Sequence, residues 1–549
     1  MLTLKKEKFL FVFLILLYVV IYSFYLPQDI MDIDSTQYAE ITREMVENQD
    51  YFTIRDNGRK YLDKPIMTFW ILSIFFKLFG ASNFAFRLPA LIMALLSVWG
   101  IYKISLLLYK EEKKAELSSL IYLSSPALFT MLTSPIIDIY LTTFIIFVFL
   151  FYYYGLFVNE KYFYLMYLFI GIGFITKGPI SLVLPIITVG GKILLTKDWD
   201  LLKKLRIGVG IVVVGIPVGL WCYFLYSDFG IFGPYFFLYL QSFGRFFSKI
   251  YDTGWDPFYF YNTFLFSILH VSIPFVIVLF RRLKNLSLKN IDKKNLELYL
   301  WVFLVLILLS FSKFRLPQYI FWLIPGAAIL AGDWFVSSLD KKVLYSFYII
   351  PTIVLILLVL LPFYTGESFK FLFYLTLFFV LILLFLFYHK DSYAMLYVLF
   401  SFALFYSYVV SSLYPMLISY QPASRIAKII FQLEENQPYS KKVLYTQGIP
   451  FSHRSYAFYT NRLTRPYILK KEQFIEELNQ EKKKLIVVEG IFLEAFKEEI
   501  KSKFSDKITI NVIAKFPYYK VSRPSWEFFN KNKRDKMLKY VYLLDLQLN

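Results

Sequence analysis

The chain has 549 residues, of which 58% are hydrophobic, 21% aromatic and only 18% charged, with a mean hydropathy of +0.54. A soluble domain carries about a quarter charged residues, so this composition excludes soluble, disordered, coiled-coil and disulfide-scaffold proteins. The net charge of +19 does not indicate nucleic-acid binding, because the basic residues crowd short loops between apolar runs, as in cytoplasmic loops of membrane proteins. We therefore expect a polytopic α-helical membrane protein that binds no nucleic acid.

The apolar runs are about 20 residues long, which is the length that crosses a bilayer. The first run follows Lys5, Lys6 and Lys8 and ends without a small-residue cleavage signal, so we expect a retained helix rather than a removed signal peptide. In chain order about thirteen transmembrane helices are predicted, at approximately 8–26, 83–109, 115–132, 136–157, 162–177, 179–196, 206–226, 257–280, 297–311, 318–338, 343–363, 368–388 and 392–415.

The Lys and Arg residues between these spans predict the orientation of the chain. With the N-terminus in the cytoplasm, nearly every basic loop falls on the cytoplasmic side: Lys110–Lys114, Asn159–Lys161, Lys197–Arg206, Arg281–Lys294, Lys341–Lys342 and His389–Lys390. Lys313 and Arg315 are the exception among the short loops, which suggests a function for them. An odd number of spans places the C-terminus outside.

Two segments are predicted outside the lipid, so the domains expected are a transmembrane part, 1–415, and an extracytoplasmic part, 416–549. The first segment is the external loop 27–82. The second is the whole of 416–549, a small α/β domain, because short β-like stretches alternate there with helical ones. The strands expected are Val443–Thr446, Leu485–Val488, Ile508–Ile513 and Tyr540–Leu544, and the helices are Glu472–Glu481 and Phe492–Phe504. Cys222 is the single cysteine, so no intrachain disulfide can form.

An acidic segment, with Asp29, Asp32 and Asp34, opens the external loop where the first helix leaves the membrane. The residues after it have the pattern of an amphipathic helix on the membrane surface. Its apolar face contains Tyr38, Ile41, Met45 and Val46, and its polar face contains Glu40, Arg43, Glu44 and Glu47. The plainer interpretation of Asp34 is a helix N-cap, with Gln37 completing a capping box.

Further along the loop, Asp63-Lys64-Pro65 places a carboxylate beside an ammonium group before a second short apolar helix. An exposed ion pair before a helix-starting proline is common, so this motif alone does not identify an enzyme.

Isolated charges recur at the outer ends of the predicted spans: Asp138, Lys177, Arg245, Lys313 and Arg315. An ionisable group near hydrocarbon is costly, and snorkelling is the plain explanation for a lone Lys or Arg. It explains Asp138 less well, because that side chain is short. Together with Asp34, Asp63 and Lys64, these residues predict one site at the outer leaflet. Its cations suit a lipid phosphate, and its carboxylates suit a base or a divalent cation.

These motifs make the chain resemble the polytopic GT-C glycosyltransferases that use polyprenyl-phosphate sugars. The resemblance is to the lipid A aminoarabinose transferase and its protein O-mannosyltransferase relatives in particular. The stretches that carry it begin at Asp34, Tyr61, Thr176 and Ser312 and surround Asp138. Asp63 stands where the family has a Glu before Lys-Pro, and Ser35 stands where a second acid is common.

The resemblance implies a role for each matching position. The catalytic residues would be Asp34, Asp63 and Asp138, which are also the candidates for a divalent metal. The residues that bind substrate or lipid phosphate would be Tyr38, Tyr61, Lys64, Lys177, Arg245, Lys313, Arg315 and Tyr319. Asp34 would act as base or orienter for an acceptor that attacks the anomeric carbon with inversion.

We therefore expect an enzyme of the bacterial inner membrane that moves a sugar from a polyprenyl phosphate donor to lipid A or lipopolysaccharide at the periplasmic face. The sugar expected is 4-amino-4-deoxy-arabinose or an acidic sugar such as galacturonic acid. Three alternatives stay open. They are a protein O-mannosyltransferase-like enzyme, a flippase or transporter for a lipid-linked sugar, and a binding or assembly protein that works through its external domain.

Overall fold

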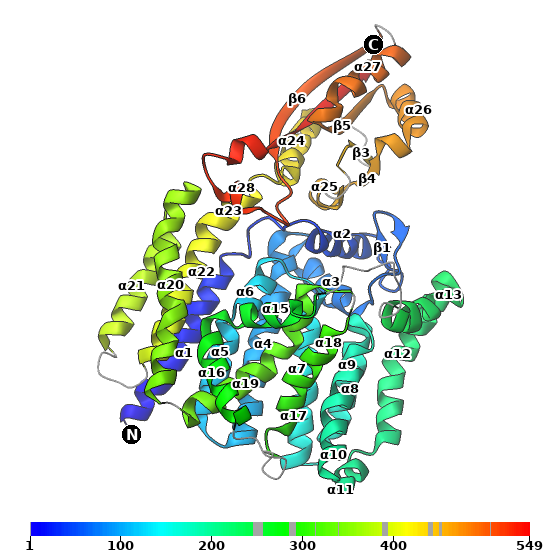
Figure 1. The fold of residues 1–549 in the computed structure, drawn as a ribbon. Helices are drawn as coiled ribbons and strands as arrows, with labels where there is room; N and C mark the ends of the chain where they lie inside the picture. The colour runs from blue at the N-terminus through cyan, green and yellow to red at the C-terminus, as the bar shows by residue number, and fades with distance from the viewer. Residues whose placement is uncertain are drawn as a thin grey trace.

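The structure is a computed structural model that describes residues 2–244, 256–284, 293–312, 314–338, 340–386, 393–436, 443–449, 453–504 and 507–548. A helical body, residues 2–418, forms the lower part in Figure 1, and a C-terminal lobe, residues 423–548, forms the upper part. Helix α2 (Asp34–Glu47) and strand β1 (Arg55–Asp56) lie at the boundary between them.

In the described part of the body, the strands are those of one small hairpin, formed by β1 and β2 (Arg59–Lys60), and the other elements are helices. Its first half contains α1 (Leu2–Ser23), α3 (Met67–Phe79), α4 (Asn83–Tyr109), α5 (Glu112–Leu123), α6 (Pro126–Thr133), α7 (Ile137–Phe157), α8 (Tyr162–Lys177), α9 (Ile180–Pro185), η1 (Ile186–Gly190), α10 (Gly191–Thr196), α11 (Trp199–Lys204) and α12 (Ile207–Phe229). Its second half contains α13 (Phe232–Tyr235), η2 (Phe236–Gly244), α15 (Tyr259–Ser267), η4 (Leu269–Val271), α16 (Ser272–Lys284), α17 (Leu296–Tyr299), η6 (Leu300–Leu304), α18 (Val305–Ser310), η7 (Pro317–Leu323), α19 (Ile324–Ser337), α20 (Lys341–Thr365), α21 (Phe371–Leu386), α22 (Tyr393–Tyr408), η8 (Val409–Leu413) and α23 (Tyr414–Ile418).

Among the described residues, six helices are long and apolar enough to cross a membrane, or seven if one bent pair counts as a single span. The predicted number of thirteen spans is not confirmed by this criterion. The bent pair is α15 with η4–α16, which turns by 80°, so the predicted span 257–280 is not a straight helix. The predicted span 115–132 is also divided, because Ser125 caps α6 and Pro126 begins it.

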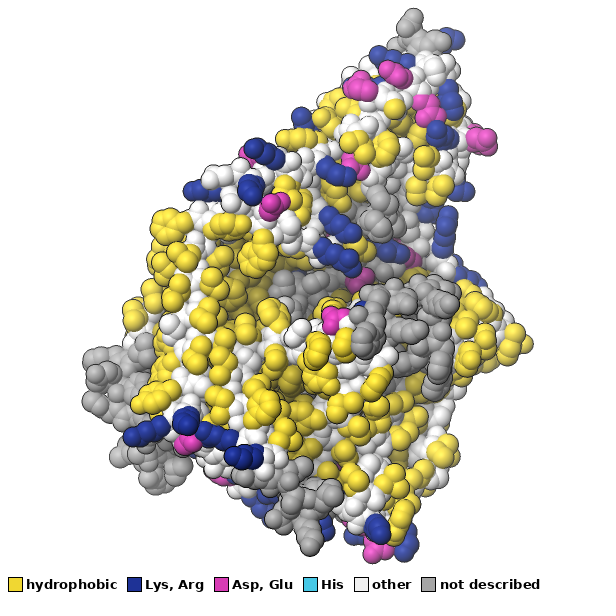
Figure 2. Space-filling model, in the orientation of Figure 1, with side chains coloured by type: hydrophobic (Ala, Val, Ile, Leu, Met, Phe, Trp, Pro, Cys, Tyr) yellow, Lys and Arg dark blue, Asp and Glu magenta, His cyan; other side chains and the backbone are white. Residues whose placement is uncertain are grey.

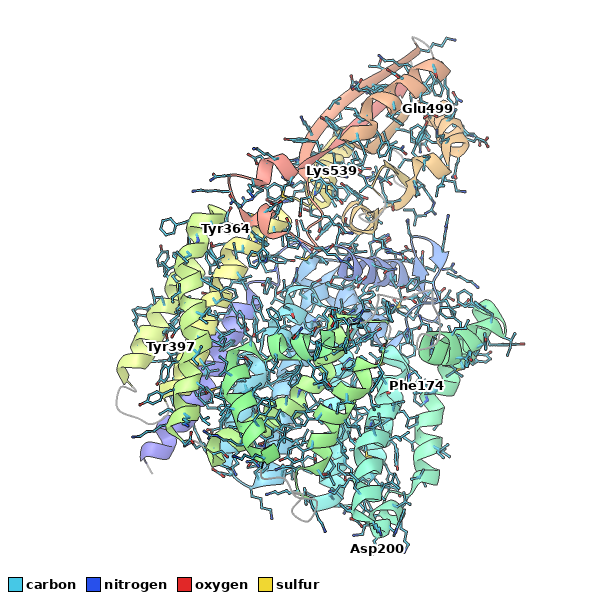
Figure 3. The ribbon with its side chains drawn as sticks, viewed as in Figure 1. Phe174, Asp200, Tyr364, Tyr397, Glu499 and Lys539 are labelled. Carbon is cyan, nitrogen blue, oxygen red and sulfur yellow. The ribbon has the colours of Figure 1, made fainter. Side chains whose placement is uncertain are left out.

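Ion pairs join loops that the sequence predicts on the cytoplasmic side. These pairs are Lys8–Glu112 (3.1 Å), Lys204–Glu160 (3.9 Å) and Arg281–Asp340 (2.8 Å). The N-terminus lies at this lower end of the body, and Figure 3 places Asp200 there too, far from Glu499 in the lobe. The basic loops and the C-terminal lobe therefore lie at opposite ends of the helical body.

The C-terminal lobe contains a five-stranded sheet in the order β4-β3-β5-β7-β6. Its elements are α24 (Ala423–Asn436), β3 (Val443–Gln447), α25 (His453–Thr460), β4 (Leu463–Pro466), η9 (Tyr467–Leu469), α26 (Lys471–Glu481), β5 (Lys483–Glu489), η10 (Gly490–Phe492), α27 (Leu493–Phe504), β6 (Ile508–Tyr518), α28 (Trp526–Phe529), η12 (Arg534–Met537) and β7 (Lys539–Leu548). All four predicted strands lie within β3, β5, β6 and β7. Strand β4 is additional, and it pairs in parallel with β3.

The surface of the body is hydrophobic over its sides, whereas charged side chains gather on the lobe and at the lower end (Figure 2). Helix α12 illustrates the pattern, since only 17% of its most apolar window is buried inside the protein. A helix that is apolar all round and unburied is stable in lipid and not in water. The sides of the body are therefore the surface that meets hydrocarbon.

Candidate active site

A cavity of about 200 Å³ opens at the end of the body nearest the C-terminal lobe. It lies where the loop before α3 meets the turn between α8 and α9 and the segment from α18 to η7. Its charged and polar lining consists of Asp63, Lys64, Lys177, Gln241, Ser312 and Tyr319. Its apolar lining includes Phe237, Leu309, Phe314 and Trp322. Two lysines on aromatic walls suit a ligand with an anionic head and an apolar chain.

Asp138 and Lys177 form an ion pair at one side of this cavity. Asp138 is in the first turn of α7, and Lys177 is the last residue of α8, so each charge has the sign that the helix dipole favours. Asp138 is only 2% exposed, and it also accepts a hydrogen bond from Trp322 Nε1 at 3.0 Å. The pair is therefore held in one geometry by three different elements.

The Lys177 ammonium lies over two aromatic rings, 5.1 Å from the centroids of both Tyr319 and Trp322. These two residues are three apart in η7, which is a 3₁₀-helix, so their side chains stack along one face. Gly178 follows Lys177 with φ of +95° and turns the chain toward Pro179. A side chain at this position would be strained, so the Lys-Gly-Pro turn requires glycine for backbone reasons.

Asp63 and Lys64 also form an ion pair, and both line the cavity. Asp63 accepts hydrogen bonds from Tyr61 Oη at 3.4 Å and from Gln241 Nε2. The pair is partly exposed, with 25% of the Lys64 side chain accessible. The cavity therefore receives one cation from the external loop and one from the end of α8.

Tyr38 lies close enough to all three candidate acids for their charges to affect its pKa. Its ring is buried and packs edge-on against Phe69 of α3, with centroids 5.9 Å apart. Burial raises the pKa of Tyr38 well above its usual value, and the charges of Asp34, Asp138 and Asp63 raise it further. The phenol therefore stays protonated at neutral pH and can donate a hydrogen bond. The three acids all lie within electrostatic reach of this one hydroxyl.

Asp34 differs from the other two acids because it is exposed and forms no ion pair with any described residue. The interpretation of Asp34 as an N-cap is wrong. The N-cap of α2 is Ile33, Asp34 is the first helical residue, and the Gln37 amide donates to Asp56 at 2.7 Å instead of completing a capping box. A carboxylate in the first turn still benefits from the helix dipole.

Helix α2 is not the surface helix that its amphipathic pattern predicted. Most of its polar face is covered, since Glu40, Arg43 and Glu44 are at most 5% exposed, and Glu47 at its end stays exposed. Arg43 pairs with Glu40 at 2.6 Å and bonds Asn461 of the C-terminal lobe. The prediction of a solvated polar face is wrong because residues far along the chain pack against it, which the local pattern cannot show.

Arg315 is buried but does not line the cavity. Its guanidinium donates to the Asp256 carbonyl at 2.8 Å and lies 5.5 Å from the centre of the Tyr259 ring.

Arg245 and Lys313, which the sequence also predicted for the site, lie outside the described residues. Trp322, Gln241, Phe237 and Phe314 were not predicted. Trp322 could have been inferred from its three-residue spacing from Tyr319, whereas the contact of Gln241 with Asp63 joins residues 178 apart.

In the described part of the chain, no three His, Cys, Asp or Glu residues form a group that could hold a metal ion. Asp34, Asp63 and Asp138 stay candidates for a divalent metal, and Asp63 and Asp138 each already have a lysine partner. Lys64 and Lys177, which line the cavity, are placed to meet the anionic part of a ligand.

The loop that carries Asp63 and Lys64 is held in place by the C-terminal lobe. Arg454 of α25 binds Asp56 through two nitrogens, with a shortest distance of 2.7 Å. Asn57 and Thr464 exchange hydrogen bonds of 2.7 and 2.8 Å between the hairpin and β4. Because Asp56 also accepts from Gln37 of α2, one carboxylate joins α2, the hairpin and the lobe.

We expect Arg454→Ala to lower the rate of turnover about tenfold, because it removes two charge-assisted hydrogen bonds from this junction. Arg454→Lys should recover little, since an ammonium cannot reproduce the bidentate geometry. Lys471→Ala is a matched control, because Lys471 pairs with Glu499 at 2.8 Å within the lobe. A double-mutant cycle with Asp56→Asn measures the coupling, expected to be about 1–3 kcal/mol. A coupling near zero would contradict this role.

Residues 63–221 match the family model described as dolichyl-phosphate-mannose-protein mannosyltransferase. The undecaprenyl phosphate-alpha-4-amino-4-deoxy-L-arabinose arabinosyl transferase of Serratia proteamaculans is 27% identical over 321 residues, which are 56% of this chain and 56% of that protein. The Aeromonas salmonicida protein of the same description is 30% identical over 320 residues, with the same coverage of each chain. The chain thus matches a little over half the length of these curated relatives.

The fold extends the likeness over almost the whole chain. The crystal structure of ArnT from Cupriavidus metallidurans bound to undecaprenyl phosphate superposes with a TM-score of 0.73 and 18% identity, covering 97% of both chains. Its apo form gives a TM-score of 0.71, covering 98% of both chains. The chain is therefore similar in sequence to the undecaprenyl phosphate-alpha-4-amino-4-deoxy-L-arabinose arabinosyl transferases over a little more than half of its length, and it shares the fold of the ArnT structures over nearly all of it.

Proposed function

We propose that this chain is an integral-membrane glycosyltransferase that takes a sugar from a polyprenyl phosphate donor. The observation that carries the proposal is the cavity with Lys64 and Lys177 on its walls, at the end of a lipid-facing helical body. A phosphate between two lysines, with an apolar chain on Phe237, Phe314 and Leu309, matches the chemistry of a lipid phosphate. The ArnT crystal structure with undecaprenyl phosphate supports the same class of donor.

The proposed reaction is a direct displacement at the anomeric carbon. The acceptor oxygen attacks that carbon, the bond to the phosphate oxygen breaks, and the electron pair leaves with the polyprenyl phosphate. The leaving phosphate gains a negative charge, which Lys64 and Lys177 stabilise. Asp34 takes the proton of a hydroxyl acceptor, or orients a phosphate acceptor that is already ionised. The neutral Tyr38 hydroxyl is available as a hydrogen-bond donor beside it.

We infer that the sugar is 4-amino-4-deoxy-arabinose or a related sugar such as galacturonic acid, and that the acceptor is lipid A or lipopolysaccharide. The named relatives support the first sugar. In the proposed topology the protein lies in the bacterial inner membrane with about thirteen spans, its N-terminus in the cytoplasm and residues 416–549 in the periplasm. The ion pairs among the basic loops, at the end opposite the cavity, support this orientation.

The direct test is mass spectrometry of lipid A from cells with and without the protein. The expected result is a lipid A species heavier by one sugar that depends on this chain and disappears in Asp34→Asn. Donor consumption by the purified protein in detergent separates an enzyme from a flippase, because a flippase leaves the donor intact. Unchanged lipid A together with an intact donor would contradict the proposal.

A protein acceptor is the second candidate, because the matching family model describes protein mannosyltransferases. It predicts that the purified enzyme transfers sugar to a Ser or Thr hydroxyl of a peptide and leaves lipid A unmodified.

A further inference from the structure

The segment 520–539 of the C-terminal lobe, here called the α28–η12 segment, lies at the end of the membrane-spanning candidate α20. Tyr364 Oη donates to the Trp526 carbonyl at 2.9 Å, and the Lys531 amide donates to the Tyr364 carbonyl at 3.0 Å. Arg534 donates to the Thr365 carbonyl at 2.6 Å. Figure 3 shows Tyr364 where the lobe meets the body. Since α20 ends at Thr365, these contacts place the segment at the level where this helix leaves the membrane.

The inner side of the segment is anchored by Phe528, which is fully buried. Its ring stacks on Tyr519 at a centroid distance of 3.9 Å and meets Tyr420 edge-on at 5.2 Å. Phe528 also packs with Leu417 at the end of the helical body. The segment is thus a packed part of the structure, and its outward side chains have a defined position relative to the bilayer.

The outer side presents large aromatic rings. Trp526 is 77% exposed, and Phe363 in the last turn of α20 is 75% exposed. A tryptophan this exposed is unusual on a surface that faces only water. At the level of lipid headgroups, however, Trp is enriched, because its ring meets hydrocarbon while its N–H stays hydrated.

The same segment is rich in cations. Residues 520–539 contain seven cations and two anions, a net charge of +5. Six of the cations are exposed, namely Lys520, Arg523, Lys531, Lys533, Lys536 and Lys539, and Lys539 pairs with Glu489. The anions are Glu527, which pairs with Lys533 at 3.3 Å, and Asp535. In Figure 2, Lys and Arg side chains gather at the upper left, where the lobe meets the hydrophobic side of the body.

We propose that the α28–η12 segment docks on the bilayer and binds the headgroups of anionic phospholipids. Trp526 enters the headgroup layer, and the surrounding lysines and Arg523 meet lipid phosphates. Polybasic segments beside a spanning helix bind anionic lipid in this way. The proposal rests on α20 crossing the membrane and not on sugar transfer, so its failure would leave the proposed reaction untouched.

The test uses the full chain with Cys222→Ser, which removes its single cysteine. Trp526→Cys then carries an environment-sensitive fluorophore, and the protein is placed in nanodiscs of phosphatidylcholine alone or with 30% phosphatidylglycerol. Ile491→Cys is the matched control, because Ile491 is an exposed apolar residue of the same lobe, at 69%. We expect spin-labelled lipid to quench position 526 at least twofold more than position 491, and more strongly in the anionic nanodiscs.

Charge reversal completes the experiment. Lys531→Glu with Lys533→Glu should abolish the effect of phosphatidylglycerol at position 526, whereas Lys497→Glu with Lys501→Glu on α27 should leave it unchanged. Because all four lysines are on the lobe surface or partly exposed, we expect these variants to fold. Quenching at position 526 that equals quenching at position 491, or that is the same in both lipid compositions, would overturn the proposal.

Discussion

Asp34→Asn is expected to lower the rate of sugar transfer by about 10²–10⁴-fold, the range typical of a lost general base. Asp34 is exposed at the start of α2 and forms no ion pair with a described residue, so the substitution leaves no buried partner unpaired. The free energy of unfolding should fall by less than about 1 kcal/mol, the value of one charge in a first helical turn. Donor affinity should stay within about twofold, because in the proposed reaction the donor phosphate is bound by lysines and not by Asp34.

The measurements are single-turnover transfer in detergent, donor binding and thermal unfolding. Asp200→Asn is a matched control, since Asp200 is also an exposed aspartate in the first turn of a helix and lies at the opposite end of the body. A variant at position 34 that transfers sugar at the native rate would remove Asp34 from the mechanism.

Lys177→Met is expected to lower the free energy of unfolding, the affinity for the donor and the rate of sugar transfer. It removes the partner of Asp138, a carboxylate that is only 2% exposed. Removing one member of a buried ion pair destabilises a protein by about 3–5 kcal/mol. It also removes one of the two cavity lysines, so donor affinity should fall at least tenfold and transfer at least 100-fold.

The double variant Asp138→Asn with Lys177→Met separates these two effects. It leaves no unpaired carboxylate, so most of the lost stability should return, whereas donor affinity should stay low. Lys192 of α10 and Glu297 of α17 offer a matched ion pair, because Glu297 is fully buried and both helices lie toward the lower end of the body (Figure 1). Lys192→Met should therefore lower stability without changing donor affinity. If the double variant at 138 and 177 binds donor normally, Lys177 does not hold the phosphate.

The membrane character and several residues of the candidate site could be predicted from local sequence. Apolar runs of about 20 residues have few alternatives to spanning a bilayer, and short β-like stretches between helical ones indicated the strands β3, β5, β6 and β7. Charges at the ends of apolar runs are costly enough to suggest a site, and Lys64, Lys177 and Tyr319 do line one cavity with Asp63.

Contacts between segments far apart in the sequence decided which predicted residues are covered and which line the cavity. The polar face of α2 was predicted to meet water, but Arg43 meets Asn461, more than 400 residues further along the chain. Like Lys177, Arg315 is an isolated cation at the outer end of a predicted span, yet its guanidinium donates to the Asp256 carbonyl and it does not line the cavity. Periodicity reports which side of a helix is polar, but not whether solvent, lipid or another domain covers it. That choice depends on long-range packing, and only the tertiary structure contains it.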